Sequence, residues 1–155
     1  MPAEEQKREL RAALAPGIAV GVSEATIHDL VHAFYARVRL DEVIGPVFER
    51  AVADWDTHLA KLCDFWSSVL LMSGRFKGTP MATHALLPDI QPSHFARWLE
   101  LFQDTARSRC PAPASALFIA KAEIIGQSLQ LGIAASRGEL TPPPNLTPTA
   151  TVQRA

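Results

Sequence analysis

Apolar residues recur along most of this chain with the spacing of an α-helix. In the clearest case they follow the pattern i, i+3, i+4, i+7, i+8, i+11, at Ile27, Leu30, Val31, Phe34, Tyr35 and Val38. All of them then share one face of a helix, which Ser23 can cap and which runs toward Leu40. No competing segment shows the alternation of a half-buried β-strand, so the sequence predicts an all-α fold.

A second amphipathic helix is predicted from the N-cap Asp54 to about Met72, where Gly74 closes it. At about 100° per residue, its apolar face takes Trp55, Leu59, Leu62, Phe65, Trp66, Val69 and Leu70. The opposite face takes Asp56, Ala60, Lys61, Asp64, Ser67 and Ser68. His58 projects into the apolar arc near its edge, which makes it a candidate for a pocket inside the fold.

Proline and glycine divide the remainder of the chain into shorter elements. Pro16-Gly17 is expected to end a short solvated N-terminal helix, and Gly45-Pro46 to make a tight corner. Thr79-Pro80 indicates the start of a brief helix that carries His84 and ends near Leu87-Pro88.

Two more helices follow, and both offer apolar side chains. Pro92 and Ser93 begin the first, whose buried face is expected to hold Phe95, Trp98, Leu99 and Phe102. After Pro111 and Pro113, the last helix offers Leu117, Ile124, Ile125, Leu129 and Leu131. The chain then becomes rich in Pro and Thr, a composition typical of disorder. We therefore expect an N-terminal extension over 1–22, a helical domain over 23–137 and a disordered tail over 138–155.

Composition excludes several classes of partner. The 155 residues suit one domain, and 15 Lys and Arg against 16 Asp and Glu leave a net charge of −1. This balance argues against nucleic acid or an anionic membrane as partner. No apolar stretch is expected to span a membrane. The two cysteines have no metal-binding spacing and no CxxCH motif accompanies them; with no apolar run behind a basic N-terminal segment, we expect a soluble, cytoplasmic protein.

Polar residues on apolar helix faces are the candidates for a site. His84 and His58 could face each other across an apolar slot, with Tyr35 and Trp98 beside them. From the residues alone, His84 could equally be a surface or cap histidine and His58 a half-buried residue at the edge of the core. Periodicity alone favours ordinary core packing for Tyr35 and Trp98.

Other reactive residue types are assigned ordinary roles. His28 and His32 are spaced i, i+4, as a metal pair could be, but they project away from the apolar face and are expected to be solvated. His94 is expected on the surface near a helix start. Cys63 is expected to be a small buried hydrophobic residue rather than a redox thiol.

The ordered motifs resemble the truncated haemoglobins, and more closely their third group (group III, P-type). The matching strings are FYARVRLDEVIGPVFE (34–49), W-x-x-H-x-x-x-L (55–62), FW (65–66), GTP with H-x-x-L-P (78–88) and HFARWLELF (94–102). Any one of them would be weak evidence, but their order and spacing are specific. The resemblance covers about half the chain, and the glycine pairs of the other groups are absent, as this group's pattern requires.

The resemblance implies a two-over-two helical sandwich over 23–137 around a non-covalent haem b. His84 matches the proximal iron ligand; Tyr35, His58 and Trp98 match the polar residues on the distal side and would be the catalytic ones. The implied cofactor-binding residues are Phe34, Phe48, His58, Leu62, Phe76, Met81, His84, Leu87, Phe95 and Trp98. Arg75 and Lys77 are open between pairing with haem propionates and being loop cations.

The same resemblance implies binding of O2, NO and CO. A distal pocket with several donors favours tight retention or redox chemistry of O2, NO or peroxide over bulk oxygen transport, in the manner of an NO dioxygenase or a peroxidase, with an electron-donating reductase as partner. Two alternatives remain: a non-catalytic gas-sensing module, and an all-helical interaction domain without cofactor.

Overall fold

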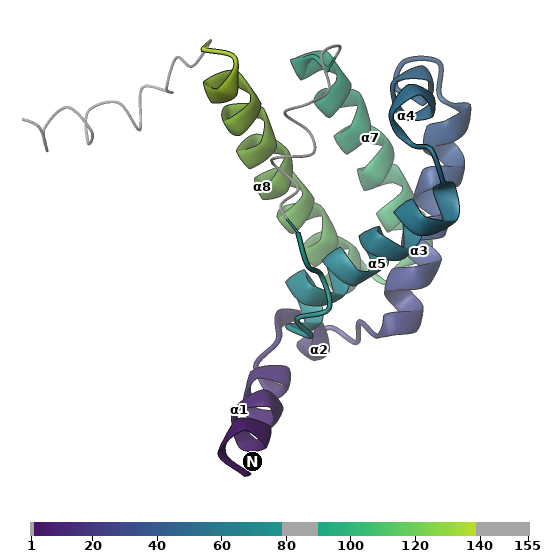
Figure 1. Cartoon of the computed structure of the whole chain (residues 1–155). Coiled ribbons are helices and arrows are strands. Elements are labelled where there is room, and N and C mark those ends of the chain that lie inside the picture. The colour runs from purple at the N-terminus through teal and green to yellow at the C-terminus, as the bar shows by residue number, and fades with distance from the viewer. Residues whose placement is uncertain (1, 79–89, 139–155) are drawn as a thin grey trace, which may run out of the picture.

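The computed structural model describes residues 2–78 and 90–138, and every regular element within these two stretches is an α-helix (Figure 1). The all-α prediction is therefore confirmed. The helices are α1 (Pro2–Ala13), α2 (Pro16–Ala19), α3 (Glu24–Leu40), α4 (Gly45–Ala51), α5 (Trp55–Leu71), α7 (Pro92–Arg109) and α8 (Ala112–Ser136). The brief helix predicted between Thr79 and Pro88 and nearly all of the predicted tail lie outside the described residues.

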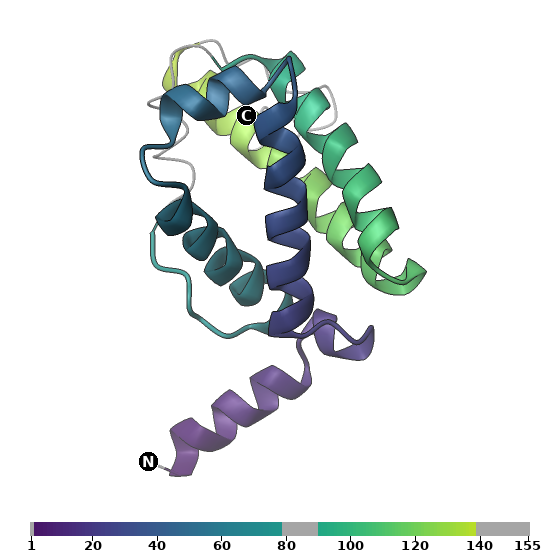
Figure 2. The ribbon, with the colours of Figure 1, turned by 90° about the vertical axis from the view of Figure 1, so that its right-hand side faces the viewer.

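Four helices form the body of the fold in two layers. The helices α7 and α8 pack along each other, and α3 contacts both α5 and α7. Figure 2 shows α3 and α5 on one side and the α7/α8 pair on the other, which is the expected two-over-two arrangement. The short α2 contacts α5 and α8, whereas α1 extends away from the body (Figures 1 and 2).

The predicted caps of the two central helices are confirmed. The Ser23 hydroxyl accepts the N–H of Thr26 at 3.2 Å, and the Thr26 hydroxyl accepts the N–H of Ser23 at 3.2 Å, which makes a capping box. At the start of α5, Asp54 Oδ1 accepts the N–H of Asp56 at 3.1 Å. The end of α5 differs in detail from the prediction, because Met72 rather than Gly74 takes the left-handed conformation that stops the helix, with φ 54°.

Two proline-containing pairs begin helices instead of only interrupting them. Gly45-Pro46 opens α4, so the predicted tight corner is wrong and Phe48 lies on a helix. Pro16-Gly17 likewise opens α2. The reason is the same in both places: the first turn of a helix leaves its N–H groups without intrahelical partners, so proline loses nothing there. Gly17 is also sterically required, because a Cβ there would lie 2.8 Å from the Leu70 carbonyl oxygen.

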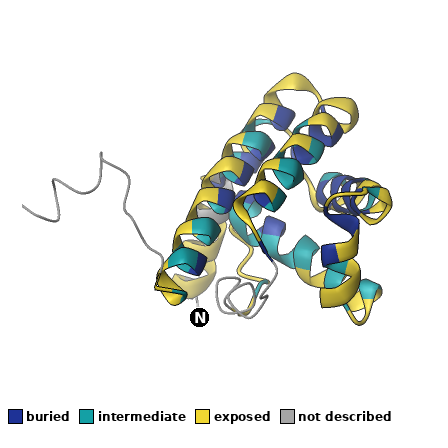
Figure 3. Ribbon diagram, turned by 90° about the horizontal axis from the view of Figure 1, so that it is seen from above, coloured by how far each residue is buried: buried dark blue, intermediate teal, exposed yellow. Residues whose placement is uncertain are grey.

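The core lies where α3, α5, α7 and α8 meet, and Figure 3 shows their inward faces buried. Its largest fully buried side chains are Phe34, Phe102 and Phe118. Ser67 is buried as well, with no exposed surface, so its predicted place on the solvent face of α5 is wrong. Its hydroxyl donates to Glu24 Oε2 at 2.7 Å and lies 2.7 Å from the Ser73 hydroxyl, and these contacts satisfy it inside the protein.

Helix α8 confirms three of the five large residues expected to be available for burial, because Leu117, Ile125 and Leu129 pack against buried residues. Ile124 is 57% exposed and Leu131 38% exposed, whereas Ala122 and Gly126 face the core. The expectation that both Ile124 and Leu131 are buried is therefore wrong. By length and composition α8 could cross a membrane, which also corrects the expectation that no stretch is long enough; core helices meet the same criterion, and α8 packs along α7.

Candidate functional site

A cavity of about 290 Å³ opens between α3, α4, α5, α7 and α8. Its volume is at the lower end of the range for small-molecule sites. Most of its wall is apolar, and the lining residues are Tyr35, Ile44, Val47, Phe48, Ala51, Val52, His58, Lys61, Leu62, Phe65, Trp66, Phe76, Ile90, His94, Phe95, Trp98, Ile125 and Leu129. Only a few polar groups interrupt this wall, and three of them gather beside one another.

Tyr35 and Trp98 bring their polar atoms together from two helices. The indole N–H of Trp98 on α7 donates to the Tyr35 hydroxyl oxygen on α3, at 3.5 Å. Because the Tyr35 oxygen accepts this bond, its own O–H proton remains available for another acceptor. His58 on α5 completes the group, with its ring centroid 5.8 Å from that of Tyr35 and the two rings nearly perpendicular.

Burial keeps the Tyr35 hydroxyl protonated. The side chain is 5% exposed, and desolvation raises its pKa from 10.0 to about 12, although the hydrogen bond from Trp98 acts in the opposite direction. A neutral phenol is a hydrogen-bond donor, whereas a phenolate could only accept. Tyr35 therefore offers a donor to the cavity throughout the physiological pH range.

The aromatic residues around this polar group hold it in place. Phe34 lies at an edge-to-face angle to both Tyr35 and Trp98, at 4.6 and 5.8 Å between ring centroids. Phe102 stacks on Trp98 at 5.6 Å. Phe48 from α4 approaches Tyr35 at 5.6 Å and His58 at 6.4 Å. Such pairs restrict ring orientation as well as filling space.

Most of the predicted site residues meet in this cavity. Tyr35, Phe48, His58, Leu62, Phe76, Phe95 and Trp98 all line it. Phe34 does not: it is 1% exposed and lies behind Tyr35 and Trp98. Met81, His84 and Leu87 lie outside the described residues, so their predicted roles are neither supported nor contradicted by the described geometry.

Two polar residues line the cavity although the sequence did not predict it. His94 lines the cavity instead of being a surface residue, and its Nδ1 accepts the N–H of Gln91 at 2.9 Å. Lys61 also reaches the lining although its residue is exposed. Both could have been found by spacing, since His94 stands one turn before Trp98 and Lys61 nearly one turn after His58. Arg75 instead forms an exposed ion pair with Glu24, at 3.6 Å.

The remaining reactive residues stay apart from the cavity. The rings of His28 and His32 stack at 3.9 Å on the outer side of α3, and no cluster of three metal-ligating side chains occurs among the described residues. Cys63 is half-buried, and burial raises the pKa of its thiol, which keeps the reactive thiolate scarce. The exposure of His28 and the packing of Cys63 against the core agree with the roles predicted for these two residues, while His32 is partly buried.

The residues of the cavity suit a haem. A porphyrin is flat and largely apolar, and the slot offers it aromatic and aliphatic walls. The clustered donors at Tyr35 and Trp98 suit a small ligand that becomes negatively charged on iron. Lys61, at once exposed and part of the lining, suits a carboxylate at the rim.

Comparison with known proteins supports the same conclusion. No protein-family model matches the chain. The chain is 29% identical over 113 residues to the group 3 truncated hemoglobin ctb of Campylobacter jejuni, which covers 70% of this chain and 89% of the relative. The crystal structure of the group III truncated hemoglobin from Campylobacter jejuni superposes with a TM-score of 0.67, again at 29% identity and covering 70% of this chain and 89% of that one. Sequence, fold and cavity together show that the chain has the truncated globin fold and is similar to the group III truncated haemoglobins, a similarity that implies binding of haem and of diatomic ligands.

Proposed function

We propose that this protein holds a haem b without covalent attachment, ligated by His84, and that it retains O2 or NO for redox chemistry rather than carrying oxygen in bulk. The observation that carries the proposal is the pair of donors, Tyr35 and Trp98, whose polar atoms lie 3.5 Å apart in a largely apolar cavity. A carrier needs easy release of its ligand, whereas converging donors slow that release.

Haem supplies an iron with an open coordination position and the capacity to exchange electrons. In the proposal, a neutral His84 imidazole holds the iron through one nitrogen, while the second nitrogen donates to a carbonyl or water that fixes its tautomer. Lys61 pairs with a propionate at the rim. The electron supply falls to a separate reductase.

On the distal side the proposal gives each polar residue a distinct task. Tyr35 donates its O–H to the bound ligand, and Trp98 donates its indole N–H either to the ligand or to the Tyr35 hydroxyl oxygen. His58 projects from α5 toward the same point, and in the proposal it gates entry or passes a proton. Phe48 and Leu62 exclude water, which strengthens the donors' electrostatic effect.

Replacing Tyr35 or Trp98 by Phe is expected to speed O2 release about tenfold or more in each case. A hydrogen bond to a charged acceptor contributes about 1.5–3 kcal/mol, and about 1.4 kcal/mol corresponds to tenfold. Stopped-flow displacement of O2 by CO from the ferrous protein measures the rate. Trp55→Phe is the matched control, because Trp55 lies 6.1 Å from Tyr35 but does not line the cavity. Native release rates in both cavity variants would contradict the assignment of donors.

A second consequence concerns high pH. Because burial raises the pKa of Tyr35 to about 12 in the folded protein, its contribution is fully present below pH 10 and is lost as the pH rises toward 12. The shift corresponds to about 2–3 kcal/mol of free energy of unfolding. We expect urea unfolding to show the native protein losing that amount relative to Tyr35→Phe between pH 9.5 and about 12. If the free energy of unfolding changed with pH in the same way for the two proteins, a protonated, desolvated Tyr35 would be contradicted.

One observation favours a gas sensor as the second candidate. Helix α1 extends from the body; Leu10 on it is 62% exposed, and Leu14 just after it is 70% exposed. A partner could cover this apolar stripe and so receive the ligand signal. Deleting residues 1–14 distinguishes the two functions: a sensor loses its partner and keeps its ligand kinetics, whereas a redox enzyme keeps its turnover.

A further inference from the structure

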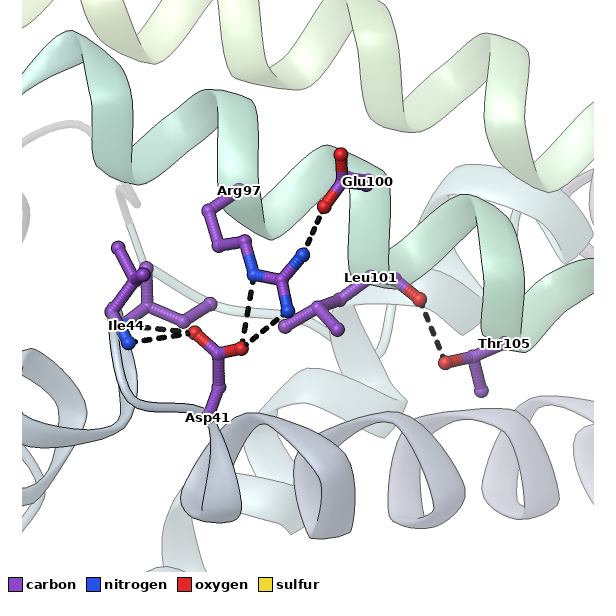
Figure 4. Close-up of polar contacts among 7 residues, drawn as sticks. Asp41, Ile44, Arg97, Glu100, Leu101 and Thr105 are labelled. Carbon is purple, nitrogen blue, oxygen red and sulfur yellow. Dashed lines mark hydrogen bonds and ion pairs between the residues drawn. The ribbon is translucent and has the colours of Figure 1, made fainter.

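One buried carboxylate joins the two helices that carry the donors. Asp41 follows the last residue of α3, and its Oδ1 accepts from Arg97 of α7, through Nη2 at 2.7 Å and Nε at 2.9 Å (Figure 4). Its other oxygen, Oδ2, accepts the N–H groups of Val43 and Ile44, each at 3.0 Å. Asp41 thus ties α7 to the turn between α3 and α4.

This ion pair differs from the others on the surface. The Asp41 side chain is 6% exposed and that of Arg97 35% exposed, whereas the Arg39–Glu49 pair is about half exposed. Exposed pairs contribute little to structure, but a carboxylate that is 6% exposed and accepts two hydrogen bonds on each oxygen has few alternative positions. Arg97 also contacts Glu100 on its own helix, and Glu100 is 61% exposed.

The ion pair and the two donors join the same pair of helices, α3 and α7. Trp98 directly follows Arg97, and Tyr35 lies on α3, which ends immediately before Asp41. The Trp98–Tyr35 bond spans the same two helices at 3.5 Å, the outer limit for a hydrogen bond. A displacement of a few tenths of an ångström between α3 and α7 therefore decides whether the two donors bond to each other. Ile44, held by the same carboxylate, lines the cavity.

We propose that Asp41 and Arg97 are positioning residues that set the separation of Trp98 from Tyr35 and thereby the strength with which the cavity donates to a bound diatomic ligand. This inference rests on the proposed function for its effect on the ligand. Its geometric part stands on the contacts between α3 and α7 alone.

Asp41→Asn tests the proposal with little other change. The amide oxygen can still accept the N–H groups of Val43 and Ile44, so the turn keeps its cap, while the amide NH2 cannot accept from Arg97. Glu100→Gln is the matched control, because it removes the other carboxylate that Arg97 contacts. Arg97→Lys keeps the positive charge but replaces the planar guanidinium by a single ammonium group. Its effect on the readouts below should fall between those of native protein and Asp41→Asn.

The primary readout is the indole N–H resonance of Trp98 in the haem-loaded, CO-bound ferrous protein, assigned with Trp98→Phe. We expect Asp41→Asn to shift this resonance while those of Trp55 and Trp66 stay in place, and Glu100→Gln to shift none of them. O2 release should become about threefold faster, a change of about 0.65 kcal/mol. The same substitution made in Trp98→Phe protein should add nothing.

Two results would overturn the inference: an unmoved Trp98 resonance in Asp41→Asn, or an equal acceleration of O2 release in the presence and absence of the Trp98 indole. Failure of the proposed function looks different. In that case Trp98→Phe releases O2 at the native rate, while the Trp98 resonance still decides whether Asp41 and Arg97 position the indole.

Discussion

His84→Ala is expected to abolish stable haem binding, with a loss of affinity well above 100-fold. An outer-shell partner of a metal ligand typically contributes 10–100-fold, and His84 is proposed as the ligand itself. Haem titration of the purified protein, followed by reduction and exposure to CO, measures the effect by absorption spectroscopy. The native protein should give a Soret band with clean CO binding, and the variant a weak or strongly altered one.

The other histidines of the cavity make this experiment specific. His58 and His94 both line the cavity, so either could in principle approach a bound haem. His58→Ala and His94→Ala should retain the Soret band and CO binding, with His58→Ala altering only the ligand kinetics. If His94→Ala lost haem and His84→Ala retained it, His94 on α7 would be the iron ligand in place of His84. A native protein that takes up no haem would refute the proposed function.

The sequence predicts the central helices well because their signals are local. The apolar period from Ile27 to Val38 and the caps Ser23 and Asp54 depend only on neighbouring residues, and the structure has each of them as expected. Ser67 could not be placed in this way. Its burial depends on Glu24, which is distant in sequence and accepts a hydrogen bond from its hydroxyl, so a polar residue on an apparently polar face became part of the interior.

The inward face of α8 and the meeting of residues in the cavity could not be predicted from local signals either. Ile124 and Leu131 are hydrophobic enough for the core but are exposed, whereas Phe118, Ala122 and Gly126 are buried on the inward side of α8. Hydrophobicity alone therefore does not tell which side chains of this helix turn inward. The apolar period places Tyr35 and Trp98 on the apolar faces of two separate helices. They meet because α3 and α7 cross. The family resemblance implied this meeting, whereas residue spacing alone did not.

Phe102→Ala is expected to lower the free energy of unfolding by about 3–5 kcal/mol. Phe102 is 1% exposed, and its ring contacts those of Phe34, Trp66 and Trp98 at 5.1, 5.3 and 5.6 Å. It therefore fills the point where α3, α5 and α7 meet, and a methyl group leaves a void that neighbouring rings cannot close without tilting. Urea unfolding followed by far-UV circular dichroism measures the loss.

Ile124→Ala provides the control, because Ile124 is 57% exposed and its truncation should change stability by about 0.5 kcal/mol or less. The two variants together test whether the core is placed correctly, and a larger loss from Ile124→Ala than from Phe102→Ala would contradict the outward position of Ile124 on α8. Phe102 also stacks on Trp98, 5.6 Å away. If the stack orients the indole, Phe102→Ala must speed O2 release as Trp98→Phe does, even under conditions where the variant remains fully folded.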